Sequence, residues 1–240
     1  MKKVLWQELR RPEFEEAIKA DAVVIIPVGS TEQHGNHLPV NTDANCCFAI
    51  AQRAALAIDE FPVLVLPPIW TGYSPHHMAY PGTITLKYQT FVELLTQVAA
   101  SVHAHGFSKI LFLNGHGGNS AVIAAMRTKL ADEEGASAIG YTYWDMPSVP
   151  EEMATVCQSD KGFIGHAGEI ETSLQLYLQP ELVDMAAAVW VPGLWGDPST
   201  GAREKGKRIV NAAVNALASI VRDYHSGKLE DRLVWRKEVL

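Results

Sequence analysis

The residues with the clearest capacity for chemistry lie in one stretch, GSTEQHGNHLPVNTD, which runs from Gly29 to Asp43. This stretch carries the carboxylates of Glu32 and Asp43 and the imidazoles of His34 and His37. Carboxylate oxygens and imidazole nitrogens together suit Zn²⁺, Mn²⁺ or Fe²⁺. The stretch therefore predicts a divalent-metal site.

Three later segments, rich in glycine or proline, carry further histidines and carboxylates. In NGHGGN, His116 is flanked by glycines, which supply no apolar shell for a core histidine but let backbone approach a ligand closely. In GHAGEIETS, His166 precedes Glu169 and Glu171, and PPIWTGYSPHHMAYPGT carries His77. The signatures of a serine hydrolase elbow, a P-loop, a dinucleotide-binding turn and a zinc-protease helix are all missing from the chain.

One late glutamate, added to the earlier carboxylates and histidines, makes five oxygen and nitrogen ligands. Five ligands are enough for two metals that share a bridging carboxylate. Two such metals generate hydroxide near neutral pH and polarise a carbonyl oxygen, which favours a hydrolase. The candidate set is Glu32, His34, Asp43, His116 and either Glu169 or Glu171.

The elements that must position these residues alternate between strands and helices. Short runs rich in Val and Ile, apolar on both faces, predict strands at Ala22–Val28, Val63–Pro67, Lys109–Asn114 and Ser137–Tyr143. Helical spacing predicts helices at Ala44–Ile58, Gln89–His105, Asn119–Glu134, Glu169–Leu178 and Gly201–Tyr224, with Thr42 or Asp43 as the N-cap of the first and an irregular stretch at Trp144–Gly165. This alternation predicts an α/β fold, a three-layer α/β/α sandwich with a mostly parallel central sheet. In such folds the ligand site lies at the carboxyl ends of the strands.

Composition narrows the class of protein further. The 240 residues, 48% of them hydrophobic, fit a single domain spanning 1–240. A formal charge of −7 gives no electrostatic footprint for nucleic acid. Three cysteines make no disulfide framework, and neither a signal peptide nor a membrane span is recognisable, so a cytoplasmic protein is expected.

The four motifs, in this order and spacing, resemble the creatininase (creatinine amidohydrolase) family. The resemblance implies an α/β hydrolase with two divalent metal ions per chain (Zn, Mn or Fe), commonly a homohexamer. It implies that Glu32 and His116 bind one metal, that His34 binds the second and that Asp43 bridges both. His166 matches the family's catalytic histidine, which passes a proton from the attacking water to the leaving group.

The chain departs from creatininase proper at Gly118, where that enzyme has a glutamate. The missing carboxylate must come from the GHAGEIETS segment, with Glu171 as the first choice and Glu169 as the alternate. The same change makes creatinine itself a doubtful substrate and indicates the broader NGHGGN branch. Residues expected to contact a small cyclic substrate are His77, Tyr73, Trp144, Gly117 and Gly118.

Three functions are compatible with the sequence. The first is hydrolytic opening of a small cyclic amide by a metal-bound hydroxide. The second is hydrolytic carbon–carbon ring opening of a cyclic polyol ketone, as in an inosose hydrolase. The third is a non-catalytic metal-binding scaffold, which the loss of a carboxylate at Gly118 favours.

Overall fold

The computed structural model describes residues 2–160 and 163–229. Its centre is a sheet of four parallel strands in the order β2-β1-β3-β4. The strands are β1 (Val23–Val28), β2 (Val63–Val65), β3 (Lys109–Asn114) and β4 (Ala138–Thr142). All four coincide with predicted strands, and the pairing confirms the parallel sheet.

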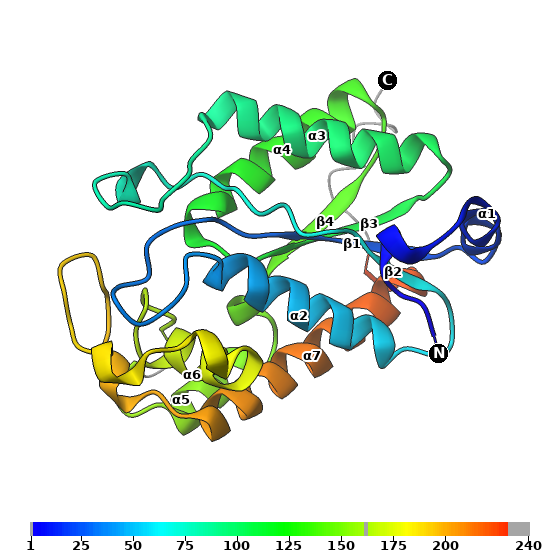
Figure 1. The fold of residues 1–240 in the computed structure, drawn as a ribbon. Coiled ribbons are helices and arrows are strands. Elements are labelled where there is room, and N and C mark those ends of the chain that lie inside the picture. Colours follow the sequence, from blue (N-terminus) through cyan, green and yellow to red (C-terminus); the bar gives the residue numbers. More distant parts are fainter. Residues whose placement is uncertain (1, 161–162, 230–240) are drawn as a thin grey trace.

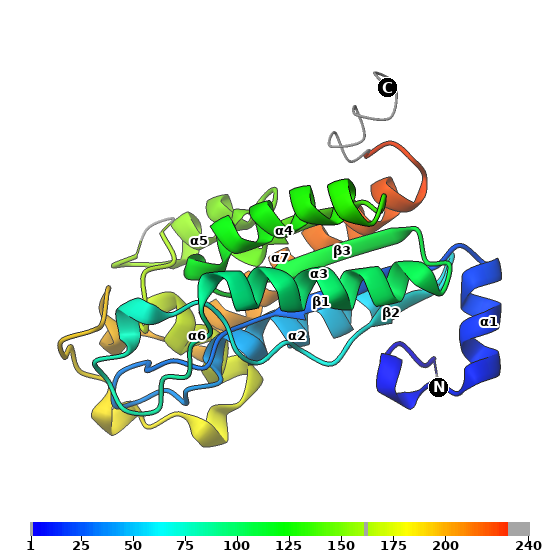
Figure 2. The ribbon, with the colours of Figure 1, turned by 90° about the horizontal axis from the view of Figure 1, so that it is seen from above.

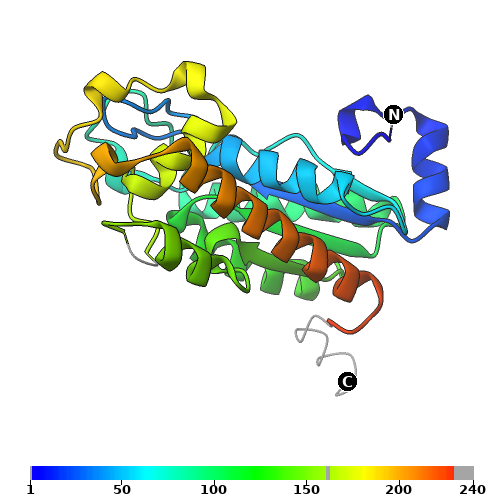
Figure 3. The same cartoon turned by 90° about the horizontal axis from the view of Figure 1, so that it is seen from below.

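Helices cover both faces of the sheet (Figure 1). One face is covered by α3 (Tyr88–Ala104) and α4 (Ser120–Glu133), with α1 (Arg11–Lys19) packed at the end nearest the N-terminus. The other face is covered by α2 (Thr42–Leu56), α5 (Val149–Val156), α6 (Glu169–Leu178) and α7 (Arg203–His225). Figures 2 and 3 show the two faces in turn, α3 and α4 over one and α2 beside α7 over the other. The predicted three-layer α/β/α sandwich is therefore confirmed.

Strand β1 explains why the sheet is buried on both sides. Its side chains alternate between two hydrophobic cores, with Val23 and Ile25 in the core beneath α2 and α7, and Val24 and Ile26 in the core beneath α3 and α4. Every residue of β1 is buried. A strand covered by helices on both faces has to be apolar at every position rather than at alternate ones.

Two local predictions were wrong. Helix α2 begins at Thr42 with Asn41 as its N-cap, so neither Thr42 nor Asp43 caps it. The hydroxyl of Thr42 instead donates to the carbonyl of Pro39, at 2.7 Å. The stretch predicted to be irregular, Trp144–Gly165, contains α5, which follows Ser148 in a left-handed conformation (φ 70°).

The order of the strands leaves room for a ligand site at their carboxyl ends. Helix α2, which follows β1, lies on one face, whereas α4, which follows β3, lies on the other. The loops after these neighbouring strands therefore diverge and leave a crevice at their carboxyl ends. The loops after β1 and β2 and the segment before α7 gather at the left end of the molecule in Figure 1, away from both marked termini.

Candidate metal centre

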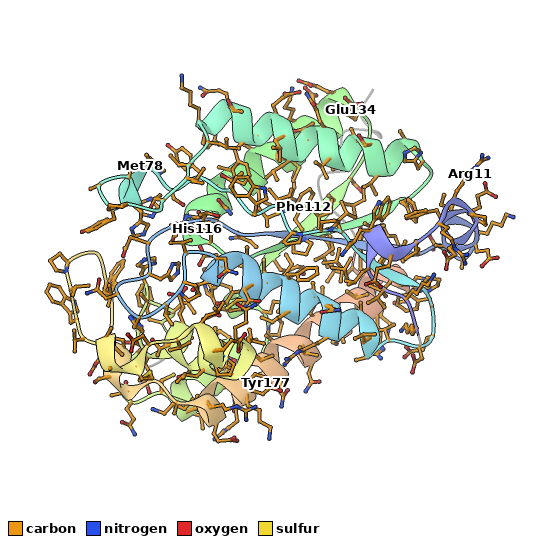
Figure 4. All side chains as sticks on the ribbon, viewed as in Figure 1. Arg11, Met78, Phe112, His116, Glu134 and Tyr177 are labelled. Atoms are coloured by element: carbon orange, nitrogen blue, oxygen red, sulfur yellow. The ribbon has the colours of Figure 1, made fainter. Side chains whose placement is uncertain are left out.

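The loops bring together all five predicted metal ligands at the carboxyl end of the sheet. Glu32 and His34 come from the loop after β1, Asp43 from the first turn of α2, His116 from the turn after β3, and Glu171 from the first turn of α6. Figure 4 labels His116 just beyond Phe112 of the core, with Met78 on the neighbouring loop after β2. The five side chains are buried, with at most 5% of any residue exposed.

The carboxylate of Asp43 lies between two histidines. One oxygen, Oδ1, is 3.1 Å from Nε2 of His34, and the other, Oδ2, is 3.1 Å from Nδ1 of His116. The remaining carboxylates flank these histidines: Glu32 Oε2 is 3.2 Å from His116 Nδ1, and Glu171 Oε2 is 3.6 Å from His34 Nε2. The cluster thus divides into two halves that share Asp43.

Several atoms of this cluster lack the partners that burial demands. Neither His34 Nε2 nor Asp43 Oδ2 makes a hydrogen bond with any described residue, although both are buried. Three carboxylates buried side by side repel one another, and the ion pairs recorded for them are all with histidines. Buried charges of this kind are normally paired or coordinate metals. The donor set therefore fits divalent cations.

The electrostatics of the cluster agree with that fit. Burial alone would lower the pKa of His116, but the carboxylates of Asp43 and Glu32, 3.1 and 3.2 Å from its Nδ1, raise the pKa to about 10. The pKa of His34 is likewise raised, against the effect of burial, by Glu171 and Asp43. The acidic groups thus attract positive charge to the two nitrogens that face them, and a metal would displace protons from those nitrogens.

Neighbouring polar groups fix the orientation of the candidate ligands. His34 Nδ1–H donates to the carbonyl of Glu32 at 3.1 Å, which leaves Nε2 bare toward Asp43. The Asn114 side chain holds the main chain of His116 from both sides, donating to its carbonyl at 2.7 Å and accepting from its N–H at 3.1 Å. Such partners set the tautomer and direction of metal-binding histidines.

Ser74 is a site residue that sequence reasoning missed. Its buried hydroxyl donates to Glu32 Oε2 at 2.5 Å and lies 3.0 Å from His116 Nε2. It therefore links the loop after β2 to one half of the cluster. A single serine carries no pattern, and its only signal was its place three residues before His77.

His166 projects from a constrained turn before α6. Ala167 next to it adopts a left-handed backbone (φ 52°), which is strained for a residue other than glycine. Gly165 before it also has a positive φ, and a Cβ there would lie 2.2 Å from the carbonyl of Trp195. His166 Nε2–H donates to the carbonyl of Gln33 at 2.7 Å, and its Nδ1 lies 3.5 Å from Glu32 Oε1. The turn therefore aims the ring at the cluster.

The two late glutamates have different surroundings. Glu171 accepts a hydrogen bond from the N–H of Ala167 and faces His34. Glu169 is also buried, but it accepts hydrogen bonds from the N–H groups of Gln158 and Ser159 and pairs with Lys205. Of the two, only Glu171 belongs to a cluster of groups able to hold a metal among the described residues.

An open cavity of about 580 Å³ leads to the cluster. Of the predicted substrate contacts, His77, Trp144, Gly117 and Gly118 line it, but Tyr73 does not. The Tyr73 ring packs edge-on against Tyr88, with ring centroids 5.6 Å apart, and its contact with a substrate stays a prediction. A wall of the cavity is apolar and is formed by Trp144, Phe163, Ile164, Leu194 and Trp195.

Gly118 is closely surrounded by neighbouring atoms in this structure. A Cβ there would lie 2.4 Å from the carbonyl oxygen of Tyr73 and 2.5 Å from His116 Nε2. A side chain at this position would displace the loop or the candidate ligand. In this structure the fifth carboxylate of the cluster, that of Glu171, comes from α6.

Comparison with known proteins decides the family. The sequence model of Creatininase, described as creatinine amidohydrolase, matches residues 7–221. The chain belongs to the creatininase family. As a member of this family it is a hydrolase.

Curated relatives of this creatininase-family chain carry different names. Creatinine amidohydrolase of Pseudomonas putida is 28% identical over 92% of this chain and 97% of its own length. A mycofactocin precursor peptide peptidase of Mycolicibacterium smegmatis is 32% identical over 83% and 84%. A 3-dehydro-scyllo-inosose hydrolase of Thermotoga maritima is 34% identical over 78% of this chain and 60% of that protein.

Solved creatininase structures share the fold. One described as creatininase Mn has a TM-score of 0.81 at 28% identity, covering 92% of this chain and 98% of its own. A variant creatininase of the Zn–Zn type has the same TM-score and identity, with 93% and 98% coverage.

Among the residues that the structure describes, no helix has the length and apolar character of a membrane span.

Proposed function

We propose that this protein is a dinuclear metal-dependent hydrolase that opens a small cyclic amide. The observation that carries the proposal is the position of Asp43, whose two oxygens each lie 3.1 Å from a different histidine. A carboxylate in that position is suited to bridge two cations. The same arrangement would be an unfavourable burial of charge in a protein that bound none.

Each half of the cluster would hold one cation. Glu32, His116 and Asp43 would hold the first, and His34, Asp43 and Glu171 the second. Zinc, manganese or iron suits these ligands. Bound there, the two ions would supply a nucleophilic hydroxide at neutral pH and polarise the substrate carbonyl. The manganese and Zn–Zn forms of the solved relatives support this choice of metals.

His166 would move the proton. Because its Nε2–H donates to the Gln33 carbonyl, its Nδ1 is free to accept. That nitrogen faces the cluster and would take a proton from the attacking water and return it to the leaving nitrogen. Burial lowers the pKa of His166, which keeps the ring neutral and able to accept.

The lining of the cavity supports the proposal of a small substrate that has a planar or apolar side. Its lining combines the apolar wall with His77 and the two glycines after His116. Trp144 lies on that wall, where it would stack on a ring, and the main chain at Gly117 and Gly118 would approach the substrate closely. A creatininase variant complexed with creatine covers 93% of this chain and supports a ligand of this size.

Carbon–carbon ring opening of a cyclic polyol ketone is the second candidate reaction. The Thermotoga maritima inosose hydrolase favours it, because that relative is 34% identical. The same nucleophile would add to a ketone instead of an amide, and an enolate would leave. The mycofactocin peptidase relative adds a short peptide to the compounds that need testing.

A substrate panel tests the proposal. Creatinine, other cyclic amides, oxidised inositols and a short peptide would be offered to the metal-loaded wild type, to Asp43→Ala and to Asp59→Ala, a surface control. We expect one cyclic amide to be hydrolysed by the wild type and the control but not by Asp43→Ala. Turnover of an oxidised inositol alone would select the second reaction. Full turnover by Asp43→Ala would contradict the mechanism. A wild type that binds fewer than two metals per chain and hydrolyses no compound of the panel would favour the scaffold.

Three broader features stay predictions. They are a single domain over 1–240, a homohexamer and a cytoplasmic location. Part of the predicted domain lies outside the described residues. The three described cysteines are free and buried, which supports a reducing compartment.

A further inference from the structure

The side chain of Gln33 lies at the meeting point of the loops that surround the cluster. The residue sits between two of the candidate ligands, Glu32 and His34, and only 7% of it is exposed. Its amide nitrogen lies 3.0 Å from His77 Nδ1, 3.1 Å from His166 Nε2 and 2.8 Å from the carbonyl of Gly193. A buried amide with three such neighbours constrains which of them carries a proton.

The orientation of this amide follows from its oxygen. The N–H of Gly35 donates to Gln33 Oε1 at 2.9 Å, so the NH₂ group must face the other side. That group has two hydrogens. The carbonyl of Gly193 can only accept, and it takes one of them. The second hydrogen is left for a histidine nitrogen that carries no proton.

His77 is the histidine that accepts it. His166 Nε2 lies 2.7 Å from the main-chain carbonyl of Gln33, which can only accept, so this nitrogen carries a hydrogen. The remaining amide hydrogen therefore points to His77 Nδ1, at 3.0 Å. In the neutral ring the proton of His77 must then lie on Nε2.

The two histidines therefore direct a hydrogen-bond donor and a hydrogen-bond acceptor toward the same carboxylate oxygen. His77 Nε2–H faces Glu32 Oε1 at 3.7 Å, and the bare Nδ1 of His166 faces the same oxygen at 3.5 Å. Their rings stack, with centroids 4.2 Å apart and planes inclined by 24°. One ring offers a donor at the edge of the cluster, and the other offers an acceptor beside it.

We propose that Gln33 is a positioning residue that fixes His77 as a hydrogen-bond donor and His166 as a proton acceptor. Resting on the proposed function, this division of roles assigns His166 Nδ1 to the proton of the attacking water, which it later gives to the leaving nitrogen. His77 Nε2–H donates to the carbonyl oxygen that gains negative charge as the water oxygen bonds to carbon. No proton is left over, because His77 donates without transferring its own.

The main chain and the side chain of Gln33 act on different histidines, which makes the proposal testable. The carbonyl that holds His166 is unaffected by substitution of the side chain. The amide that holds His77 is lost in Gln33→Glu, where a carboxylate oxygen faces His77 Nδ1. The variant should therefore change the tautomer of His77 and leave that of His166 unchanged.

The experiment is ¹⁵N nuclear magnetic resonance of histidine side chains in the zinc-loaded protein. Tautomers are read from the coupling of ring nitrogens to ring protons, and the signals are assigned with His77→Asn and His166→Asn. We expect both rings to be Nε2–H in the wild type and His77 to become Nδ1–H in Gln33→Glu. Gln175→Glu is the matched control, because this buried glutamine hydrogen-bonds to Thr42, Cys46 and Asn45 and, within the described part of the chain, to no histidine. It should leave both rings unchanged.

Two outcomes would overturn the proposal: His77 protonated on Nδ1 in the wild type, or a His77 signal that Gln33→Glu leaves unchanged. If Gln33→Glu fails to fold, Gln33→Met removes the donor without adding a charge and should give mixed His77 tautomers. An unchanged single tautomer there would equally overturn it. These signals require no substrate, so the proposed reaction can fail without affecting them. With a substrate in hand, Gln33→Glu should lower kcat about 100-fold, within the range for a lost proton-transfer or hydrogen-bonding group.

Discussion

The carboxylate of Glu171 lies 3.6 Å from Nε2 of His34, on the side of the ring that also faces Asp43. Glu169, two residues earlier in the same helix, pairs with Lys205 and accepts hydrogen bonds from the main chain of Gln158 and Ser159. The two glutamates of the first turn of α6 therefore have different roles. One completes the candidate metal cluster, and the other ties the segment before α6 to α7.

Replacing His166 should separate proton transfer from metal binding. Because its Nδ1 faces the cluster while Asp43 and the other candidate ligands would hold the metals, His166→Gln should lower kcat by about 10²- to 10⁴-fold. Metal content per chain should stay at the wild-type value. A variant that loses one metal along with its activity would make His166 a ligand instead, consistent with its proximity to His34 and Glu171.

Removing the Ser74 hydroxyl should weaken metal binding without removing a ligand. Ser74 holds Glu32 by a 2.5 Å hydrogen bond and contacts the far nitrogen of His116. Ser74→Ala should lower metal affinity about 10- to 100-fold, and excess metal should restore turnover. Competition with a chelator measures the affinity. Ser101→Ala, whose hydroxyl bonds only within α3 in the described structure, is the control and should bind metal as the wild type does.

A side chain at position 118 should destabilise the protein, whereas a side chain at position 117 should be tolerated. A Cβ on Gly118 meets the Tyr73 carbonyl at 2.4 Å, but a Cβ on Gly117 meets nothing within 4 Å. Gly118→Ala should lower the free energy of unfolding by about 1–3 kcal/mol and weaken metal binding, because His116 must move. Gly117→Ala should leave both within about 0.5 kcal/mol. Equal effects of the two substitutions in denaturant titrations would show that the loop relaxes freely.

Glu169 should make stability depend on acid pH. Burial alone would raise its pKa, but hydrogen bonds from Lys205, Gln158 and Ser159 lower it from 4.5 to about 2. Because the folded value is below the unfolded one, the stabilisation is complete above pH 4.5 and is lost as pH falls toward 2. Glu169→Gln should cost about 2–3 kcal/mol at neutral pH, with the difference from wild type shrinking below pH 4.5. Urea titrations across this range measure it, and a difference independent of pH would contradict the assignment.

The strands were predictable because their burial on both faces leaves a plain signature in the sequence. A short apolar run such as AVVIIPV predicts a buried strand when a helical pattern separates it from the next such run. Helix α5 was missed for the opposite reason. It is short, it follows Pro147 and the positive-φ residue Ser148, it carries Pro150 in its first turn, and only Val149 and Met153 in it are buried.

The charged part of the site was predictable because few structures need acidic and histidine side chains grouped in glycine-rich loops. The uncharged part was not. Gln33 and Ser74 act through contacts that exist only after distant loops pack together, and neither residue belongs to a spacing pattern. The aromatic residues of these loops were also hard to assign from sequence, since the Tyr73 ring packs against Tyr88 and does not line the cavity.

Metal content per chain, measured by inductively coupled plasma mass spectrometry, tests the central claim most directly. The proteins to compare are the wild type, Glu171→Gln and Glu169→Gln, the last a matched control because Glu169 lies in the same helix turn and is equally buried. We predict about two metals in the wild type and in Glu169→Gln, and about one in Glu171→Gln. One metal or none in the wild type would contradict a dinuclear centre, and a loss in Glu169→Gln with two metals retained in Glu171→Gln would contradict the assignment of its fifth ligand.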